Sequence, residues 1–352
     1  MNASATIRAS YIREARMSIA LPPPPHPLTD LEPRPARAEK LQDFVLVNHI
    51  EYRSKCNSER TTPSIDLDVE KTANTSQSSL DPKPQSSFDW TTNTTSSSFP
   101  TRLKKMLTVF PYRDPTYLVA ILFLLGSIDL VTNAFFDLLP RTIPSTFFET
   151  EETVAVPTTV LIGAILFFVA GVFDTFGALN ADVGTLIEDS AGKVTYQPAL
   201  LGSREFEWVP RSRKFLDLSG NSLAFQAGLL VLLGGVIFMF AGIVDFPDII
   251  PEEDNAFFGL VVFGPQIVHG ALFFVANVLL ALSGQERWYV LEVWDVDWQG
   301  AVLNAVGGFG FMMAGLFLFG GEELRAAVAA MVGSWAFLVG SLLRWYVVME
   351  VW

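Results

Sequence analysis

The sequence has little of what thiol and metal chemistry require. Among its 352 residues there is one cysteine, Cys56, and there are three histidines, His26, His49 and His269. A single thiol can form neither an intrachain disulfide nor a thiolate metal cluster, and three scattered histidines leave little for a zinc or copper site. The sequence therefore predicts no metal site and no cofactor.

Catalytic motifs are missing as well. The sequence contains no HEXXH, GXSXG, Walker or strand-linked dinucleotide loop, and each of these would place a nucleophile, a base or a phosphate cradle. Gly307, Gly308 and Gly310 do cluster, but within an apolar segment, where helix packing explains them better than phosphate binding. We therefore expect a protein that is not an enzyme.

Charge is scarce, and positive charge is scarcer. Charged residues make up 17% of the chain and the net charge is -13, which argues against nucleic-acid binding because phosphate recognition needs a clustered positive field. No long apolar run precedes residue 115, so no secretory signal peptide is expected. Arg8, Arg13 and Arg16 loosely suit a mitochondrial presequence, but a disordered basic start is the favoured interpretation.

Apolar residues, in contrast, make up 50% of the chain. They fall in six blocks of about 19 to 25 residues, each long enough to cross the roughly 30 Å hydrocarbon core of a bilayer. We therefore expect an all-α fold, a six-helix transmembrane bundle, in residues 111–352. The expected spans are Tyr117–Leu138, Val156–Leu179, Leu223–Val244, Phe258–Leu282, Ala301–Phe319 and Ala326–Val348.

The first third of the chain has a different composition. Pro22 to Pro25 is a proline run, and Thr72 to Thr101 is mostly Ser, Thr, Asn, Gln and Pro. Such segments cannot bury enough apolar area to offset chain entropy. Residues 1–110 are therefore predicted to be a disordered tail, rich in Ser and Thr, that binds cytosolic protein partners.

The loops predict the orientation of the spans. Basic residues gather on one side, at Arg102, Lys104, Lys105, Arg113, Lys193, Arg204, Arg211, Arg213, Lys214, Arg287 and Arg344, against only Arg141 and Arg325 on the other. An excess of Lys and Arg marks cytosolic loops, so both termini are expected in the cytosol; which membrane is not indicated. The sequons at Asn2, Asn74 and Asn93 would be glycosylated only in the reverse orientation.

The long cytosolic loop expected at residues 180–221 contains a basic and aromatic segment, Arg204–Phe215. An amphipathic segment of this kind suits the surface of the bilayer, where anionic lipid headgroups attract Lys and Arg. An ordinary solvated loop with one interfacial tryptophan explains the same residues equally well. Both interpretations stay open at this stage.

Small residues recur at intervals of seven within the spans. The sets are Gly163, Ala170 and Gly177; Gly228, Gly235 and Gly242; Ala301, Gly308 and Gly315; and Ala326, Gly333 and Gly340, with Gly270, Asn277 and Gly284 in the fourth span. Seven residues are about two helical turns, so each set forms a stripe on which a neighbouring helix can pack closely. The pattern predicts a tight left-handed bundle.

Three even-numbered spans carry related strings: GAILFFVAG at Gly163, GALFFVAN at Gly270 and GSWAFLVG at Gly333. Weak internal similarity of this kind favours three copies of a two-helix hairpin over chance matches in membrane composition. Copies of a hairpin share one orientation, so this is not the inverted repeat typical of many secondary transporters.

Several blocks resemble, in the same order, an uncharacterised fungal family of multi-pass integral membrane proteins. They are LLGSIDLVTNAFFDLLP at Leu124, LLGSREFEWVP at Leu200, FGPQIVHGALFFVANVLLALSGQERW at Phe263, DWQGAVLNAVGGFGFMMAGLFLFGG at Asp297 and GSWAFLVGSLLRWY at Gly333. The resemblance covers roughly residues 110–352 and implies a membrane bundle but no activity, substrate or cofactor. The chain departs from the family at Asp129 and in its short ending RWYVVMEVW, which fits a shortened C-terminus or an altered gene model.

Two ionisable residues lie near the middle of predicted spans. Asp129 and His269 stand at depths where an unpaired charge costs roughly 3 kcal/mol or more. One hypothesis pairs them, with Gln266, in a path for a small ion or solute, which makes the protein a transporter or channel. The favoured hypothesis gives both a structural role, in a non-enzymatic membrane scaffold, organiser or sensor.

Overall fold

A computed structural model describes residues 2–20, 99–188, 194–209, 211–247, 249–250, 257, 259–285 and 287–352. Six of its helices are long and apolar enough to cross a membrane. The predicted fold class, an all-α six-helix transmembrane bundle, is confirmed, and the chain is a multi-pass membrane protein. Residues 21–98, most of the predicted tail, lie outside the described residues.

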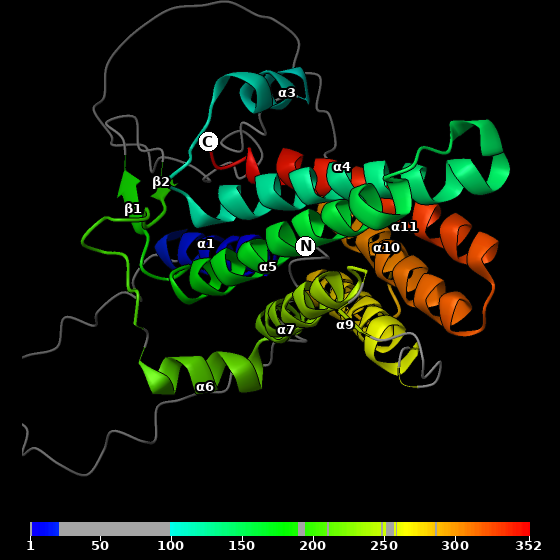
Figure 1. Cartoon of the computed structure of the whole chain (residues 1–352). Coiled ribbons are helices and arrows are strands. Elements are labelled where there is room, and N and C mark those ends of the chain that lie inside the picture. The colour runs from blue at the N-terminus through cyan, green and yellow to red at the C-terminus, as the bar shows by residue number, and fades with distance from the viewer. Residues whose placement is uncertain are drawn as a thin grey trace, which may run out of the picture. The chain divides into compact units, whose positions relative to one another are not determined.

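The six spans have the order expected from the sequence (Figure 1). They are α4 (Pro115–Thr142), α5 (Val156–Leu179) preceded by the π-helix η2 (Glu151–Ala155), α7 (Leu223–Val244), α9 (Gly264–Gly284) preceded by the π-helix η3 (Gly259–Phe263), α10 (Val296–Phe319) and α11 (Glu323–Val348). The limits of α5 and α7 match the prediction, α4, α10 and α11 extend beyond it, and α9 starts later than predicted because the π-helix η3 precedes it. We call the end at which α4 begins and α11 ends the terminal end, and the other the opposite end.

Capping residues fix where three of the spans begin at the terminal end. The side chains of Asp114, Ser222 and Asp295 accept hydrogen bonds from backbone N–H groups in the first turns of α4, α7 and α10. Pro115, which lacks an N–H group, follows Asp114 as the first residue of α4. These caps satisfy donors that the first helical turn leaves unpaired.

The spans form a closed ring. The strongest contacts link α4 to α5, α5 to α7, α7 to α9, α9 to α10, α10 to α11, and α11 back to α4. The interior of the ring is the main hydrophobic core, which contains Phe123, Phe167, Phe238, Phe273 and Phe337. A chain that circles back to its first span in this way buries one continuous apolar interior.

Three phenylalanines meet at the centre of this ring. The ring centroids of Phe167 and Phe273, and of Phe167 and Phe337, are 5.7 Å apart, and those of Phe273 and Phe337 are 6.2 Å apart. Each is the first residue of the segment that the three related strings share, which reads FFVA at Phe167, FFVA at Phe273 and FLVG at Phe337. Each packs on a glycine of the preceding span: a Cβ placed on Gly126, Gly234 or Gly307 would lie 2.7 Å from the phenylalanine. Three hairpins thus repeat one packing unit.

The striped glycines lie where helices approach most closely. A Cβ on Gly235 would lie 3.0 Å from the backbone of Phe168, one on Gly242 would lie 3.1 Å from that of Leu161, and one on Gly315 would lie 3.0 Å from that of Ile267. Gly163 faces Leu130, Gly177 faces Ser4, Gly228 faces Ala3, Gly308 faces Phe274, Gly333 faces Gly310, Gly340 faces Asn304, and Ala170 is fully buried. Dispersion between closely packed backbones is a main attraction between helices in lipid.

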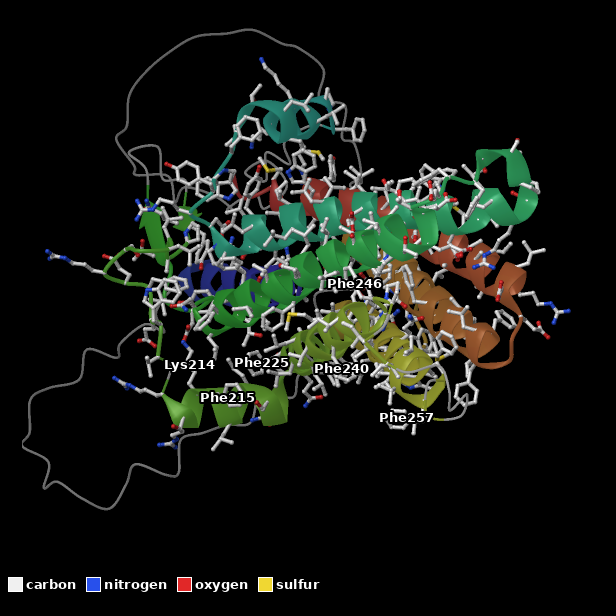
Figure 2. All side chains as sticks on the ribbon, viewed as in Figure 1. Lys214, Phe215, Phe225, Phe240, Phe246 and Phe257 are labelled. Carbon is white, nitrogen blue, oxygen red and sulfur yellow. The ribbon has the colours of Figure 1, made fainter. Side chains whose placement is uncertain are left out.

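Shorter elements surround the spans. They are α3 (Phe99–Thr108), η1 (Pro144–Thr146), α6 (Ser212–Asn221) and a hairpin of two antiparallel strands, β1 (Thr185–Glu188) and β2 (Val194–Gln197), in which Thr185 pairs with Gln197. The predicted loop 180–221 therefore includes a hairpin and a helix. In Figure 2, Phe215 of α6 and Phe225 of α7 lie beside each other, and their ring centroids are 5.5 Å apart.

The prediction of disorder is wrong for both ends of the tail. Residues Ala3–Ala20 form helix α1, which contacts α5, α7 and α9, and residues 99–108 form α3. Small residues at the start of α1 fit against glycines of the spans, and α3 packs Phe99 on Tyr346, with ring centroids 5.6 Å apart. Composition predicted disorder because the composition of a segment carries no information about surfaces elsewhere in the chain on which that segment can pack.

Candidate functional site

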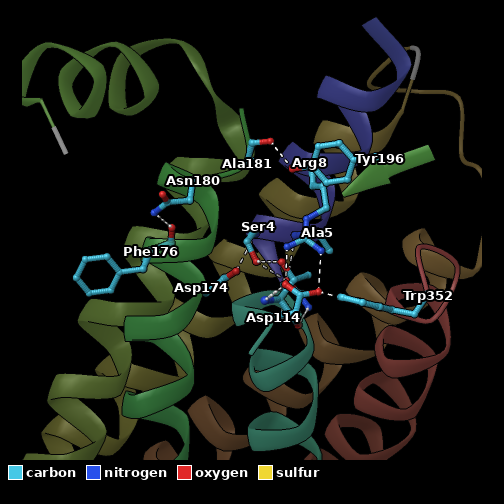
Figure 3. Close-up of polar contacts among 12 residues, drawn as sticks. Ser4, Ala5, Arg8, Asp114, Asp174, Phe176, Asn180, Ala181, Tyr196 and Trp352 are labelled. Carbon is cyan, nitrogen blue, oxygen red and sulfur yellow. Dashed lines mark hydrogen bonds and ion pairs between the residues drawn. The ribbon is translucent and has the colours of Figure 1, made fainter. Parts of the chain in front are cut away.

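The polar groups that the fold brings together lie at the terminal end, around the start of α1. Asn2, Ser4, Asp114, Thr116 and Asp174 are all buried, with exposed fractions of 3% or less. They come from α1, from α4 and its cap, and from α5 (Figure 3). Buried polar groups at this density in a membrane bundle require partners, because an unpaired group is costly away from water.

Two side chains, the carboxylate of Asp174 and the amide of Asn2, cap the first turn of α1. Asp174 of α5 accepts from the backbone N–H of Ala3 at 3.0 Å and from that of Ser4 at 2.8 Å. Asn2 accepts from the Ser4 hydroxyl at 2.8 Å and from the N–H of Ala5 at 3.1 Å. A negative charge also suits the positive end of the helix dipole. The start of α1 can therefore be buried without unpaired N–H groups in its first three residues.

Asp114 joins three parts of the chain. Its carboxylate accepts from both terminal nitrogens of Arg8, at 2.6 and 2.9 Å, from the N–H of Thr116 at 3.1 Å, and from the indole of Trp352 at 3.0 Å. The Arg8 and Asp114 side chains are 4% and 0% exposed. The Nε of Arg8 has no hydrogen-bond partner among the described residues, but the bidentate contact of the two terminal nitrogens is the geometry in which attraction best offsets the desolvation of two charges.

Tyr196 of β2 covers the guanidinium of Arg8. Its ring centroid is 6.0 Å from that group, and its hydroxyl donates to the carbonyl of Ala181 at 2.8 Å. Burial raises the pKa of Tyr196 to about 12, although the Arg8 charge lowers it. Burial by itself would lower the pKa of Arg8, but Asp114 outweighs burial and the pKa is raised. Both side chains therefore hold their protons through the physiological range.

A second ion pair lies at the same end. Arg344 of α11 is 2% exposed and pairs with Asp297 of α10. The stem of Arg344 lies against Gly300, where a Cβ would be 3.3 Å away, so the glycine makes room for it. The hydroxyl of Thr6 in α1 reaches Asp297 at 3.5 Å. The start of α1 is thus linked to α4, α5 and α10.

Two buried asparagines lie about one helical turn from the central phenylalanine packing unit, on its terminal side. Asn277 follows Phe273 by one turn in α9, and Asn304 precedes Gly307 by one turn in α10. Both are fully buried. Asn277 donates to the carbonyl of Phe273 in its own helix at 2.7 Å. Among the residues that the structure describes, the Oδ1 of Asn277 and both amide atoms of Asn304 have no hydrogen-bond partner.

The predicted intramembrane residues lie elsewhere, on the other side of the phenylalanines. His269 is enclosed by aromatic rings: it stacks on Phe238 with ring centroids 4.2 Å apart and contacts Phe273 edge-on, and its Nδ1 lies 3.2 Å from the Pro265 carbonyl oxygen. Asp129 lies over Gly163, and its Oδ2 has no partner among the described residues. Gln266 is half-buried in α9 beside Gly315. No hydrogen bond in the described part of the chain joins Asp129 to His269.

Acidic residues gather at the opposite end. Arg141 bridges Asp137, at 3.0 Å, and Glu323. Burial, with the charge of Asp137 adding to it, raises the pKa of Asp245 to about 6. Across the described part of the chain, no group of three or more His, Cys, Asp or Glu side chains is placed to hold a metal ion. The arrangement is an ion-paired surface rather than a ligand set.

On the described part of the outer surface, a broad, open groove of about 590 Å³ lies between α7 and the start of α9. Its lining is apolar: Val236, Ile237, Phe240, Leu260, Gly264, Pro265 and Val268. Phe240, 48% exposed, points outward from α7 (Figure 2). Exposed apolar surface of this kind on a span is what contact with lipid chains requires.

Sequence reasoning missed the polar cluster at the terminal end. The composition of the first third of the chain assigned Asn2, Ser4 and Arg8 to the tail. The available signal was a capping residue, Asn2, followed by small residues that can enter a helix interface. That signal is weak, because the same residues are common in disordered chains.

Comparison with known proteins adds no identification. No family model matches the chain, and neither a curated protein nor a solved structure matches it. The resemblance to fungal membrane proteins stays a prediction, and the function has to be argued from the geometry.

Proposed function

We propose that this multi-pass membrane protein is a non-enzymatic scaffold, organiser or sensor. The observation that carries the proposal is the contact among Phe167, Phe273 and Phe337, which fills the centre of the ring midway along the spans. A path for an ion needs polar groups or water along its length. Here the centre is aromatic, and His269 faces rings rather than a carboxylate.

Reconstituted vesicles should therefore carry no proton or cation flux above that of protein-free vesicles. The native chain is compared with Asp129→Asn and His269→Gln at equal folded yield, with a pH-sensitive dye and a potassium electrode as readouts. Each variant should match the native chain in flux, because the two residues do not share a path.

A flux that both substitutions abolish would overturn the proposal and make the protein a transporter or channel. A flux that neither substitution changes would also overturn it and would direct attention to another route. Loss of thermal stability in the variants, without flux in any of them, agrees with a structural role for the pair.

The proposed role includes an orientation of the spans in the membrane and a partner-binding function for the tail. Both termini are proposed to be cytosolic, because the basic residues at the terminal end exceed those at the opposite end. In that orientation the Ser- and Thr-rich tail is available to cytosolic protein partners and kinases. N-glycosylation at Asn74 or Asn93 in a secretory-pathway membrane would contradict it.

The segment Arg204–Phe215 is proposed to bind anionic lipid. Arg211 and Arg213 are exposed at the start of α6, and Trp208, 53% exposed, packs edge-on against Phe176 with centroids 5.6 Å apart. Replacing both arginines with glutamine should weaken phosphatidylserine retention, measured by native mass spectrometry, by about 2 kcal/mol. Arg325→Gln, at the opposite end, is the control and should leave retention unchanged. Equal retention in all three proteins would exclude this lipid site.

A further inference from the structure

Helix α3 packs on the bundle at the terminal end, where α4 begins and α11 ends. Met106 of α3 is buried in a cluster that contains Tyr117 of α4 and Met349, the residue that follows α11. The guanidinium of Arg102 lies 5.2 Å from the ring centroid of Tyr346. These contacts fix the position of α3 along the spans.

The length of α4 gives the level of α3 in the membrane. α4 has 28 residues and, at 1.5 Å per residue, is about 42 Å long. A bilayer is about 40 to 45 Å thick when its headgroup layers are included. The first turn of α4, which holds α3 through Tyr117, therefore lies in the headgroup layer.

An apolar stripe runs along α3 beside the face that packs on the bundle. Its members are spaced one turn apart and are Phe99, Leu103 and Leu107. Each of them is at least 46% exposed, including Phe99, which also contacts Tyr346. Lys104 and Thr108 are exposed on the other, polar side of the helix. Packing on α11 does not account for the stripe, because that contact centres on Arg102 and Met106.

The stripe lies at the edge of the lipid-facing surface of the bundle. Ile121 of α4 packs against the cluster that holds α3. Leu125, one turn further along the same face of α4, is 47% exposed, as contact with lipid chains requires. Phe110 and Tyr112, which follow α3, are exposed as well, and aromatic rings are enriched at the headgroup level. The lipid that surrounds the spans can therefore also cover the stripe.

Basic residues accompany the stripe. Lys104 and Arg113 are exposed and Lys105 is partly exposed, while α3 contains no acidic residue. Anionic headgroups attract Lys and Arg that lie near the membrane surface. The long stem of a lysine lets its ammonium group reach the headgroups while neighbouring apolar side chains lie among the lipid chains.

We propose that α3 is a membrane-surface anchor, whose apolar stripe inserts into the bilayer and whose lysines bind anionic headgroups. Helices of this kind bury their apolar face about 5 to 10 Å into the boundary between headgroups and chains. The anchor holds the start of the described chain after the tail at the headgroup level. It is independent of the scaffold or sensor role and of the lipid site at Arg204–Phe215.

Quenching by brominated lipid tests where the stripe lies. In a Cys56→Ser background, Leu107→Cys carries a fluorophore, and the full chain is reconstituted into nanodiscs. Phosphatidylcholine with brominated chains should quench this label at least about twofold more strongly than the label on Thr108→Cys, because only the stripe enters the chain region. Thr108→Cys is the matched control, on the polar side of the same turn. Equal quenching of the two labels would overturn the anchor.

The same label measures the preference for anionic headgroups. Brominated phosphatidylserine should quench the label at position 107 more strongly than brominated phosphatidylcholine at equal mole fraction. Lys104→Gln with Lys105→Gln should lower this preference by about fivefold or more, the factor that one basic residue near an anionic surface contributes. Arg211→Gln with Arg213→Gln is the control and should leave it unchanged. An unchanged preference in the double lysine variant would overturn the binding of anionic headgroups by α3.

A protein partner is the competing occupant of the stripe. If a second copy of the chain covers it, no brominated lipid will quench the label at position 107, and its emission will change with the number of chains in each nanodisc. That result would overturn the anchor and make the stripe a protein interface. None of these outcomes alters the flux test of the scaffold or sensor role.

Discussion

Gly308→Ala should destabilise the bundle by about 3 kcal/mol, at the upper end of overpacking costs, when unfolding is measured in mixed micelles. The added Cβ would meet the backbone of Phe274 and lie 2.9 Å from the carbonyl carbon of Phe273. Backbone atoms cannot rotate away as a flexible side chain can. The contact between α9 and α10 would therefore have to widen, with loss of dispersion along both helices.

Gly284→Ala is the matched control. It lies at the end of α9, and a Cβ there would have no atom within 4 Å. Alanine favours helix over glycine by up to about 1 kcal/mol, so this variant should be as stable as the native chain or slightly more stable. If Gly308→Ala and Gly284→Ala behave alike, close backbone packing at Gly308 does not hold the ring together.

Arg8→Ala should cost about 3 to 5 kcal/mol of stability, because it leaves the Asp114 carboxylate buried without its counter-charge. Both side chains are nearly inaccessible to water, so solvent cannot replace the guanidinium. Docking of α1 should be lost together with stability. Thermal unfolding of the detergent-solubilised chain measures the first effect, and maleimide reaction at Ser4→Cys measures the second.

The double variant Arg8→Ala with Asp114→Asn should recover part of the lost stability. Asparagine removes the unpaired charge and still caps α4. Arg325→Ala, which breaks the exposed pair with Glu322, should produce no measurable change, as is common for surface ion pairs. If the Arg8→Ala chain unfolds at the same temperature as the native chain, the ion pair does not hold α1 in place.

Much of the bundle is predictable because the signals for it are local. An apolar run long enough for a bilayer specifies a span without reference to the rest of the chain, and the limits of α7 match the prediction. The repeat was visible in short strings, and the shared position of Phe167, Phe273 and Phe337 gave it a geometric meaning.

The candidate site was much less predictable. Asp129 and His269 stood out because each interrupts an apolar run, yet depth in a span says nothing about which residues face each other. Asn277 lies in the stripe of small residues of the fourth span, and its amide donates within α9. A register between distant helices depends on packing around the whole ring, which no local pattern records.

By itself, the sequence determined the number, order and approximate limits of the spans, because hydrophobic length and bilayer thickness are matched segment by segment. Only the tertiary structure decided that α1 enters the ring and that Arg8 meets Asp114. The hydrogen bond from Ala3 to Asp174 joins residues 171 positions apart. Such contacts form only after the spans have packed into a ring against which the start of α1 can dock.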